Sequence, residues 1–271
     1  MAASYVTTML RSLEVLFPRE CLVCHRPLRG SYLCFRCRPT VPCLDDIMAS
    51  RCSACFSPHI HPAGDDAPCP TCILFPLMPD RIRFLWEYGG LPRDLIRAMK
   101  YRPSPTLTRL AGSWMAESLV HLFDEQTWDL IIPIPSSPIA YRKRLFHPCA
   151  ELARLVACTT PTPVYTELLR HTSARSPQAL RTHEERLRGL KGLFSCTRPT
   201  SVQGKSILVV EDVITTGATL GAAAYTLRSA GAVRVDVFAL ARTPVWARFR
   251  SRIHAIFETS QTTGQPSLFH T

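Results

Sequence analysis

Beyond residue 80 the chain alternates apolar runs with amphipathic segments. Apolar runs rich in β-branched residues are typical of strands buried on both faces. The expected strands are residues 82–88, 129–134, 164–168, 207–210 and 233–240. The expected helices are residues 91–101, 104–123, 151–158 and 182–190, with one more that ends at Ser229. Strands that alternate with helices predict an α/β fold with a mostly parallel sheet.

The N-terminal part of the chain has a different pattern of apolar residues. Apolar residues such as Val6, Met9 and Leu13 recur at helical spacing, which predicts an amphipathic helix over residues 1–18. We expect this helix to pack on the body of the protein, with a membrane-surface role as the alternative. The predicted domains are a Cys-rich segment at residues 19–79, an α/β domain at residues 80–250 and a polar tail at residues 251–271.

Cysteine spacing gives the Cys-rich segment its chemistry. Eight of the twelve cysteines lie in four C-x2-C pairs. Two such pairs supply the four thiolates of a tetrahedral Zn²⁺ site, and closed sites of this kind are structural. Taken in chain order, the pairs predict a double zinc ribbon with two zinc ions, and a crossed pairing is the alternative. The predicted ligand sets are Cys21, Cys24, Cys34 and Cys37, and Cys52, Cys55, Cys69 and Cys72.

Charge and hydropathy limit the classes of partner and the compartments that fit this chain. The chain carries 32 Lys and Arg against 21 Asp and Glu, a net charge of +11, which suits phosphate-rich partners such as nucleic acid. No apolar run approaches the ~18 residues of a membrane helix, so no membrane span is predicted. Zinc ligation rather than disulfide bonding is expected of the cysteines, in keeping with a cytoplasmic location.

The most specific chemistry lies at residues 207–220. An apolar strand precedes two carboxylates, Glu211 and Asp212, and a small-residue loop then leads into a helix. The loop consists of Thr215, Thr216, Gly217, Ala218 and Thr219. Its backbone N–H groups and hydroxyls at a helix N-terminus suit a phosphate. Carboxylates beside a phosphate fit polyol hydroxyls, a metal ion or a cationic transition state, so the segment indicates a ribose 5-phosphate site. An ordinary strand–helix loop with two capping acids is the alternative.

This segment resembles the phosphoribosyl diphosphate (PRPP) loop of type I phosphoribosyltransferases. The resemblance implies that Glu211 and Asp212 hold the ribose hydroxyls and act in catalysis, while residues 215–219 hold the 5′-phosphate. It also implies the parallel sheet of that fold and Mg²⁺ bound together with PRPP. A nitrogenous acceptor would then attack the ribose carbon as diphosphate leaves.

A second loop follows the strand that ends near residue 134. Ser136 and Ser137 precede a cationic run that includes Arg142 and Arg144. Small hydroxyls and nearby cations at a strand end are suited to a diphosphate. The alternative is a solvated basic turn.

A zinc ribbon before such a domain resembles the ComF family of competence proteins. That family has an Ala-Leu-Lys-Tyr-like segment, matched by residues 98–101, and a Pro-x-Pro strand end, matched by residues 133–135. Its Arg-Gly-Phe-Asn-Gln motif aligns with residues 144–148, where His147 and Pro148 replace Asn and Gln. We interpret the Asn and Gln side chains of the family motif, which this chain lacks, as groups that could orient a second substrate.

The ComF resemblance adds four substrate-binding candidates. Lys100 is a candidate diphosphate contact or a solvated helix lysine. Arg175, Gln178 and Arg186 match a polar stretch between strands that often forms a flap over the reaction centre. The arginines and lysine of residues 170–191 could equally follow a nucleic-acid backbone.

The family also implies a biological role. It implies a cytosolic factor that handles incoming single-stranded DNA during natural transformation, with a competence helicase or recombination proteins as partners. The alternative function is an active Mg²⁺-dependent phosphoribosyltransferase with an unknown nitrogenous acceptor.

Overall fold

The computed structural model describes residues 19–21, 24–28, 33–37, 51–57, 67–69, 72–73, 79–101, 105–123, 127–144, 146–172 and 192–244. Three predictions fall outside these residues: the N-terminal helix 1–18, the helix 182–190 and the polar tail 251–271. The candidate site residues Arg175, Gln178 and Arg186 also lie outside the described residues.

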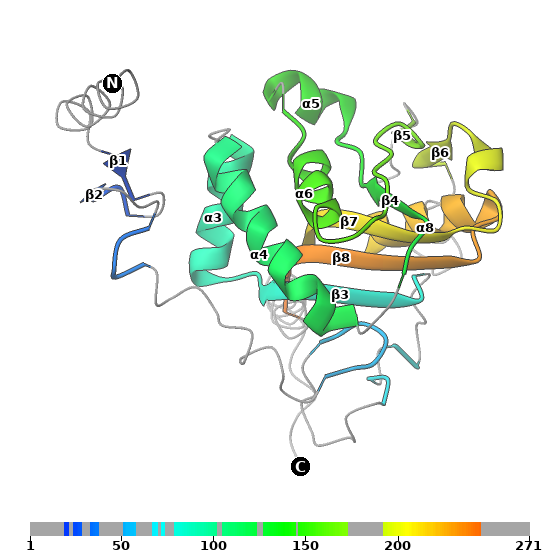
Figure 1. Cartoon of the computed structure of the whole chain (residues 1–271), viewed down its shortest axis with the longest axis horizontal. Coiled ribbons are helices and arrows are strands. Elements are labelled where there is room, and N and C mark those ends of the chain that lie inside the picture. Colours follow the sequence, from blue (N-terminus) through cyan, green and yellow to red (C-terminus); the bar gives the residue numbers. More distant parts are fainter. Residues whose placement is uncertain are drawn as a thin grey trace, which may run out of the picture.

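A parallel sheet forms the centre of the domain (Figure 1). Its four strands have the order β3-β8-β7-β4, and every neighbouring pair is parallel. The strands are β3 (Arg81–Glu87), β4 (Leu130–Pro133), β7 (Ser206–Ile214) and β8 (Arg234–Arg242). Because all four run in one direction, their carboxyl ends lie at one edge, where this class of sheet binds its ligands. The predicted α/β fold with a parallel sheet is therefore confirmed.

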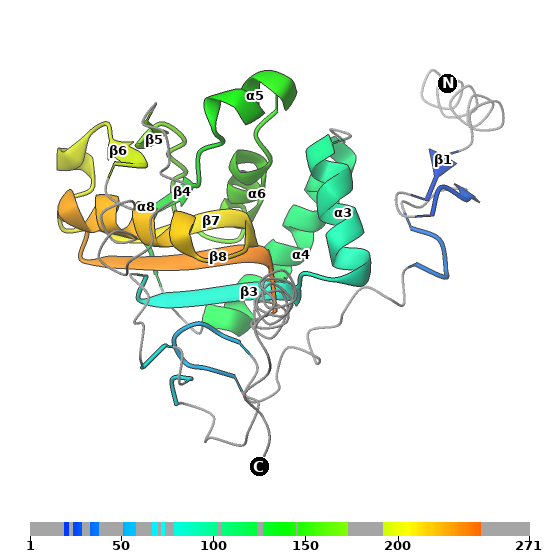
Figure 2. The same ribbon diagram turned by 180° about the vertical axis from the view of Figure 1, so that it is seen from behind.

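Helices cover both faces of the sheet (Figures 1 and 2). One core joins the sheet to α3 (Gly90–Tyr101), α4 (Pro105–Phe123) and α6 (Pro148–Ala157). The core of the opposite face joins it to α8 (Ala218–Ser229) and to the short antiparallel pair β5 (Leu169–His171) and β6 (Phe194–Cys196). Burial on both faces explains why residues 207–210 are continuously apolar.

Two shorter helices complete the α/β domain within the described residues. Helix α5 (Pro138–Arg144) follows the loop after β4, and a 3-10 turn at Pro199–Ser201 precedes β7. The strand expected at residues 164–168 is wrong, since Val164 forms only an isolated bridge with Ile131 and β5 begins at Leu169. Tyr165 and Glu167 are exposed beyond the edge strand β4, so nothing continues the pairing there.

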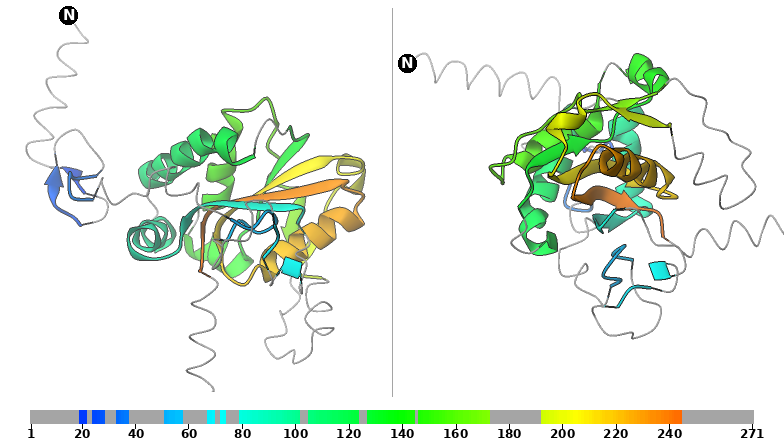
Figure 3. Two further views of the ribbon diagram at one scale, coloured as in Figure 1. Left: turned by 90° about the horizontal axis from the view of Figure 1, so that it is seen from below. Right: turned by 90° about the vertical axis from the view of Figure 1, so that its right-hand side faces the viewer.

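The described cysteine segments lie in two separate places (Figures 1 and 3). The antiparallel pair β1 (Arg19–Glu20) and β2 (Pro27–Leu28) belongs to the first cluster, which packs against Leu110 and Trp114 of α4. Residues 51–57 of the second cluster instead lie along the edge strand β3, where the Ile82 amide donates to the Ala54 carbonyl at 2.9 Å. The two clusters are therefore attached to different elements of the α/β domain.

Candidate phosphoribosyl site and cysteine clusters

The acid pair lies inside strand β7 rather than after it. The strand was expected to end at Val210, but its pairing with β8 continues to Ile214 opposite Arg242. The pairing persists because β8 is equally long and buried along nearly its whole length. Asp212 is only 6% exposed, while Glu211 is half-buried. Both carboxylates are therefore held by a rigid strand near the carboxyl edge of the sheet.

Lys100 near the end of α3 is the counter-charge of this pair. Its Nζ lies 2.7 Å from Asp212 Oδ1, and both side chains are largely buried. Burial alone would lower the pKa of Lys100, but the Asp212 carboxylate outweighs it and the pKa is raised. Lys100 therefore stays charged. Because its side chain is largely buried against Asp212, its interpretation as a solvated helix lysine is wrong.

Glu211 has the opposite electrostatic situation. Burial and the neighbouring Asp212 raise the pKa of Glu211 well above its usual value, and Lys100 only partly offsets this. A second cation or a set of hydroxyl donors at the pair would favour its charged form. Lys100 alone therefore does not fully compensate the charge of the acid pair.

The predicted phosphate loop connects β7 to α8. Thr215, Thr216 and Ala218 are exposed, and Gly217 adopts a left-handed conformation with φ 79°. This conformation favours glycine and turns the chain sharply into the helix. Gly217 has no side chain to cap α8, and the Ala218 amide instead donates to Thr216 Oγ1 at 3.3 Å. The helix N-terminus therefore meets the loop hydroxyls, and its dipole would favour an anion there. The partly buried Thr219 follows in the first turn of the helix.

The second predicted loop follows β4, the neighbour of β7. Ser136 and Ser137 are half-buried between β4 and α5, and the Tyr141 amide donates to the Ser137 carbonyl at 2.9 Å. Because β4 and β7 are adjacent and parallel, both loops leave the sheet at the same edge. On α5, Arg142 is exposed, and the side chain of Arg144 lies outside the described part of the chain.

Two residues of this region carry roles that the sequence reasoning missed. His147 is the N-cap of α6, where Nδ1 faces the Ala150 amide at 3.0 Å and Nε2 faces the Ser136 amide at 3.2 Å. The residue aligned with the family's Asn is therefore a helix cap, not a free polar group for a second substrate. Pro148 at the first helical position was the signal that could have shown this.

The second missed residue is Cys149, which is buried beneath the acid pair. Its Sγ and carboxylate oxygens of Glu211 and Asp212 all lie within 4.8 Å of one another. Burial first, and then the two carboxylates, raise the pKa of this thiol well above its usual value. Cys149 is therefore a neutral, buried thiol next to the acid pair.

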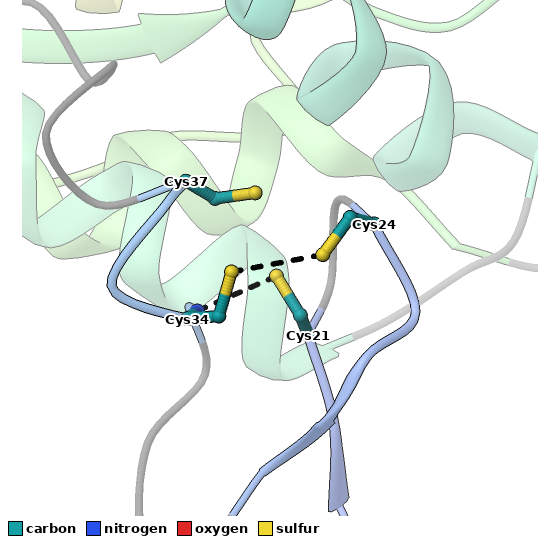
Figure 4. Close-up of side chains that lie close together, drawn as sticks. All are labelled: Cys21, Cys24, Cys34 and Cys37. Atoms are coloured by element: carbon teal, nitrogen blue, oxygen red, sulfur yellow. Dashed lines mark hydrogen bonds between the residues drawn. The ribbon is translucent and has the colours of Figure 1, made fainter.

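The first cysteine cluster has the geometry of a zinc site (Figure 4). Cys21, Cys24, Cys34 and Cys37 point toward a common centre, and the Cys24 and Cys34 sulfur atoms are 3.6 Å apart. Tetrahedral Zn–S bonds of about 2.3 Å place sulfur atoms about 3.8 Å apart. The Cys34 amide also donates to Cys21 Sγ at 3.4 Å, which stabilises a thiolate.

The second cluster repeats this arrangement. Cys55 and Cys69 have sulfur atoms 3.9 Å apart, and the Cys55 and Cys69 amides both donate to Cys52 Sγ. With Cys72, these residues complete four ligands within 4.8 Å of one another. The structure brings the four knuckles together in chain order, and each of the two clusters could hold a zinc ion.

Two arginines of the sheet donate hydrogen bonds to the second cluster. Arg83 on β3 donates to the Ser53 carbonyl at 3.1 Å, and Arg242 at the end of β8 donates to the Cys55 carbonyl. Arg242 is 7% exposed, and its Nε has no hydrogen-bond acceptor within the described residues. Zinc with four thiolates carries two negative charges, so cations of this kind would balance a loaded cluster.

Comparison with known proteins agrees with this geometry. The model of the family described as "Phosphoribosyl transferase domain" matches residues 100–254, more than half of the chain. The chain belongs to the phosphoribosyl transferase domain family.

Relatives of nearly full length narrow the family further. The chain is 29% identical to "DNA utilization protein YhgH" of Salmonella typhimurium, covering 83% of this chain and 98% of that protein. It is 26% identical to "Competence protein ComFC" of Bacillus subtilis, covering 78% of this chain and 84% of that protein. These relatives confirm the ComF family predicted from the sequence.

Similarity to solved structures is more distant. "Structure of the allosteric regulatory enzyme of purine biosynthesis" matches at 21% identity, covering 48% of this chain and 25% of that chain, with a TM-score of 0.35.

Proposed function

We propose that this protein is a ComF-type DNA-utilisation factor whose pocket binds a phosphoribosyl diphosphate ligand and which handles single-stranded DNA. The observation that carries the proposal is the shared position of the acid pair, Lys100 and both loops. The two loops follow the adjacent parallel strands β4 and β7, at the edge where such sheets bind ligands. The acid pair lies near the end of β7, and Lys100 of α3 reaches Asp212 from the side of the helix.

Each part of the pocket has a complementary part of the ligand. Glu211 and Asp212 are proposed to accept from the ribose hydroxyls, and residues 215–219 to donate to the 5′-phosphate. The diphosphate is proposed to lie against Ser136 and Ser137, with Mg²⁺ arriving with the ligand and sharing oxygens of the acid pair. The remaining proposed substrate contacts are Lys100, Arg142, Arg144, Arg175, Gln178 and Arg186.

Lys100 has a further consequence for binding. The Lys100 ammonium lies 2.7 Å from Asp212 Oδ1. Mg²⁺ or a ribose hydroxyl at Asp212 would compete with that contact, while the diphosphate would attract the freed ammonium. Ligand binding is therefore proposed to move Lys100 from Asp212 toward the diphosphate.

Single-stranded DNA is the proposed macromolecular ligand. The supports are the net charge of +11, the names of the full-length relatives and exposed aromatic side chains near cations. Phe35 of the first cluster is 73% exposed, and the Arg36 guanidinium lies 5.8 Å from its ring centre. Tyr141, next to Arg142 on α5, is 51% exposed. A helicase or recombination protein of the DNA-uptake machinery is the proposed protein partner.

The proposed function includes a location in the cell. No helix in the described part of the chain is long and apolar enough to cross a bilayer. We propose the cytoplasm because reduced thiols, which both zinc clusters require, persist there.

Fluorescence anisotropy with a labelled single-stranded oligonucleotide tests the DNA half of the proposal. Affinity should fall steeply as salt rises, because phosphate contacts release counterions. The F35A variant should weaken binding, whereas the exposed Val233, far along the chain from either cluster, offers V233A as a matched control. Absence of binding at low salt would contradict direct DNA handling.

The acid pair also favours a second candidate function, catalysis of phosphoribosyl transfer. Departure of diphosphate leaves positive charge on the ribose carbon, which Glu211 and Asp212 could stabilise electrostatically. Diphosphate release from PRPP and Mg²⁺, measured across a panel of amines and nucleobases, tests it. Binding of PRPP without release from any acceptor would leave the pocket as a binding site only.

A further inference from the structure

His147 connects the loop after β4 to the start of α6. Its backbone is extended, with φ −117° and ψ 90°, and Pro148 occupies the first position of the helix. One ring nitrogen faces the Ala150 amide of the helix, and the other faces the Ser136 amide of the loop. The imidazole therefore lies between the helix N-terminus and the candidate diphosphate loop.

The chemistry of imidazole limits what this residue can do at both contacts. Both partners are backbone N–H groups, which only donate. A neutral imidazole has one acceptor nitrogen and one N–H, and an imidazolium has no acceptor at all. The neutral ring can therefore accept from the helix or from the loop according to its tautomer, and the protonated ring can accept from neither.

We propose that His147 is a pH-sensitive positioning residue that holds the Ser136 loop in place when neutral and releases it when protonated. The proposal rests on the proposed function, since this loop matters for binding only if it receives the diphosphate. Held in this way, the loop would keep the Ser136 hydroxyl in place for the diphosphate.

The surroundings of His147 keep it neutral near physiological pH. Burial is the largest influence and lowers the pKa of His147, and Arg154 on its own helix acts in the same direction. Asp212 on β7 and Glu167 before β5 oppose them, and the net shift is downward. The folded protein therefore favours the neutral ring above about pH 6.5, and this contribution is lost as the pH falls through the lowered value.

The ComF motif itself supplies the matched control. Asn, which stands in the family motif where this chain has His147, is also a good N-cap, because its side-chain oxygen accepts from helix amides. It does not titrate. The H147N variant therefore retains a cap and loses only the pH response, while Glu211 and every other titrating group remain.

Calorimetry of the zinc-loaded full-length protein with Mg²⁺-pyrophosphate tests the proposal. Titrations of wild type and H147N at several pH values from about 7.5 down to about 4.5 cover the ordinary histidine pKa and the range below it, where the lowered pKa of His147 lies. Protonation of pyrophosphate itself affects both proteins equally. Wild type should lose about two- to tenfold more affinity than H147N on acidification, the worth of one hydrogen bond. Equal losses in the two proteins would overturn the proposal.

Nuclear magnetic resonance of the ligand-free protein separates this proposal from the proposed function. The Ser136 amide signal of wild type should shift with the protonation of the His147 ring, and that of H147N should not. If pyrophosphate binds neither protein while the shift is present, the ligand assignment fails and the positioning contact stands. A Ser136 amide that ignores the titration of the ring overturns the His147 proposal whatever the calorimetry shows.

Discussion

Replacement of Lys100 by methionine probes the electrostatics of the candidate site most sharply. The substitution keeps most of the side-chain volume and removes the charge that lies 2.7 Å from Asp212. It leaves two adjacent carboxylates, one of them buried, without that compensating cation. The free energy of unfolding should therefore fall, and the fall should depend on pH.

Exposure sets the magnitude of this effect. Exposed ion pairs contribute about 0–1 kcal/mol, whereas removing one partner of a buried pair costs about 3–5 kcal/mol. The side chains of Lys100 and Asp212 are 23% and 8% exposed, so the pair is closer to the buried case. We expect K100M to lose about 2–4 kcal/mol near neutral pH.

The pH dependence follows from the pKa of Glu211. Burial and Asp212 raise this pKa above its unfolded value, and loss of Lys100 removes the influence that lowers it. A carboxyl with a raised folded-state pKa destabilises the protein above that pKa and is relieved as the pH falls toward its ordinary value of about 4.3. The deficit of K100M should therefore be largest at neutral pH and shrink on acidification.

Urea unfolding of zinc-loaded wild type, K100M and K205M measures the deficit. Lys205 and Asp129 form an ion pair of 3.1 Å with side chains 44% and 42% exposed, so K205M removes an equivalent charge from an exposed pair. K205M should cost at most about 1 kcal/mol. If K100M costs no more than K205M, and its deficit does not change with pH, the reasoning is refuted.

Three further predictions concern packing and metal. G112A should lose about 1–2 kcal/mol in urea unfolding, since a Cβ there would lie 2.3 Å from Leu155 Cδ1, whereas G89A, with open space around it, should change stability by less than about 0.5 kcal/mol. C21S and C52S should each lose one zinc by metal analysis, and C52S should lower the melting temperature more because its cluster is bonded to β3 and β8. Chelation of both ions should lower the melting temperature of wild type, and readdition of Zn²⁺ should restore it; a temperature unchanged by chelation would contradict structural zinc.

The sequence predicts the elements of the sheet well because buried parallel strands and amphipathic helices leave distinct periodicities. Helices α3 and α4 and strand β3 lie within a residue or two of their expected bounds. Cysteine spacing predicts both metal clusters, because two knuckles close in the chain are the easiest to bring together. The loop after β7 is equally local, since its glycine and hydroxyls mark a turn into a helix.

Contacts between distant parts of the chain could not be predicted in this way. Lys100 and Asp212 are 112 residues apart, and nothing in either segment names the other as its partner. The bonds from Arg83 and Arg242 to the second cluster are of the same kind. His147 was missed for a different reason, because the family motif drew attention to the absent Asn rather than to the helix start that His147 caps.

Calorimetry with PRPP and Mg²⁺ on wild type and D212N tests whether the acid pair forms part of a phosphoribosyl diphosphate site. The substitution keeps the shape of the side chain and removes the charge proposed to meet the ribose hydroxyls and the metal ion. We expect saturable binding to wild type and at least about tenfold weaker binding to D212N, because a hydrogen bond to a charged group contributes about that much affinity. Absence of binding to wild type, or equal affinity of the two proteins, would contradict it.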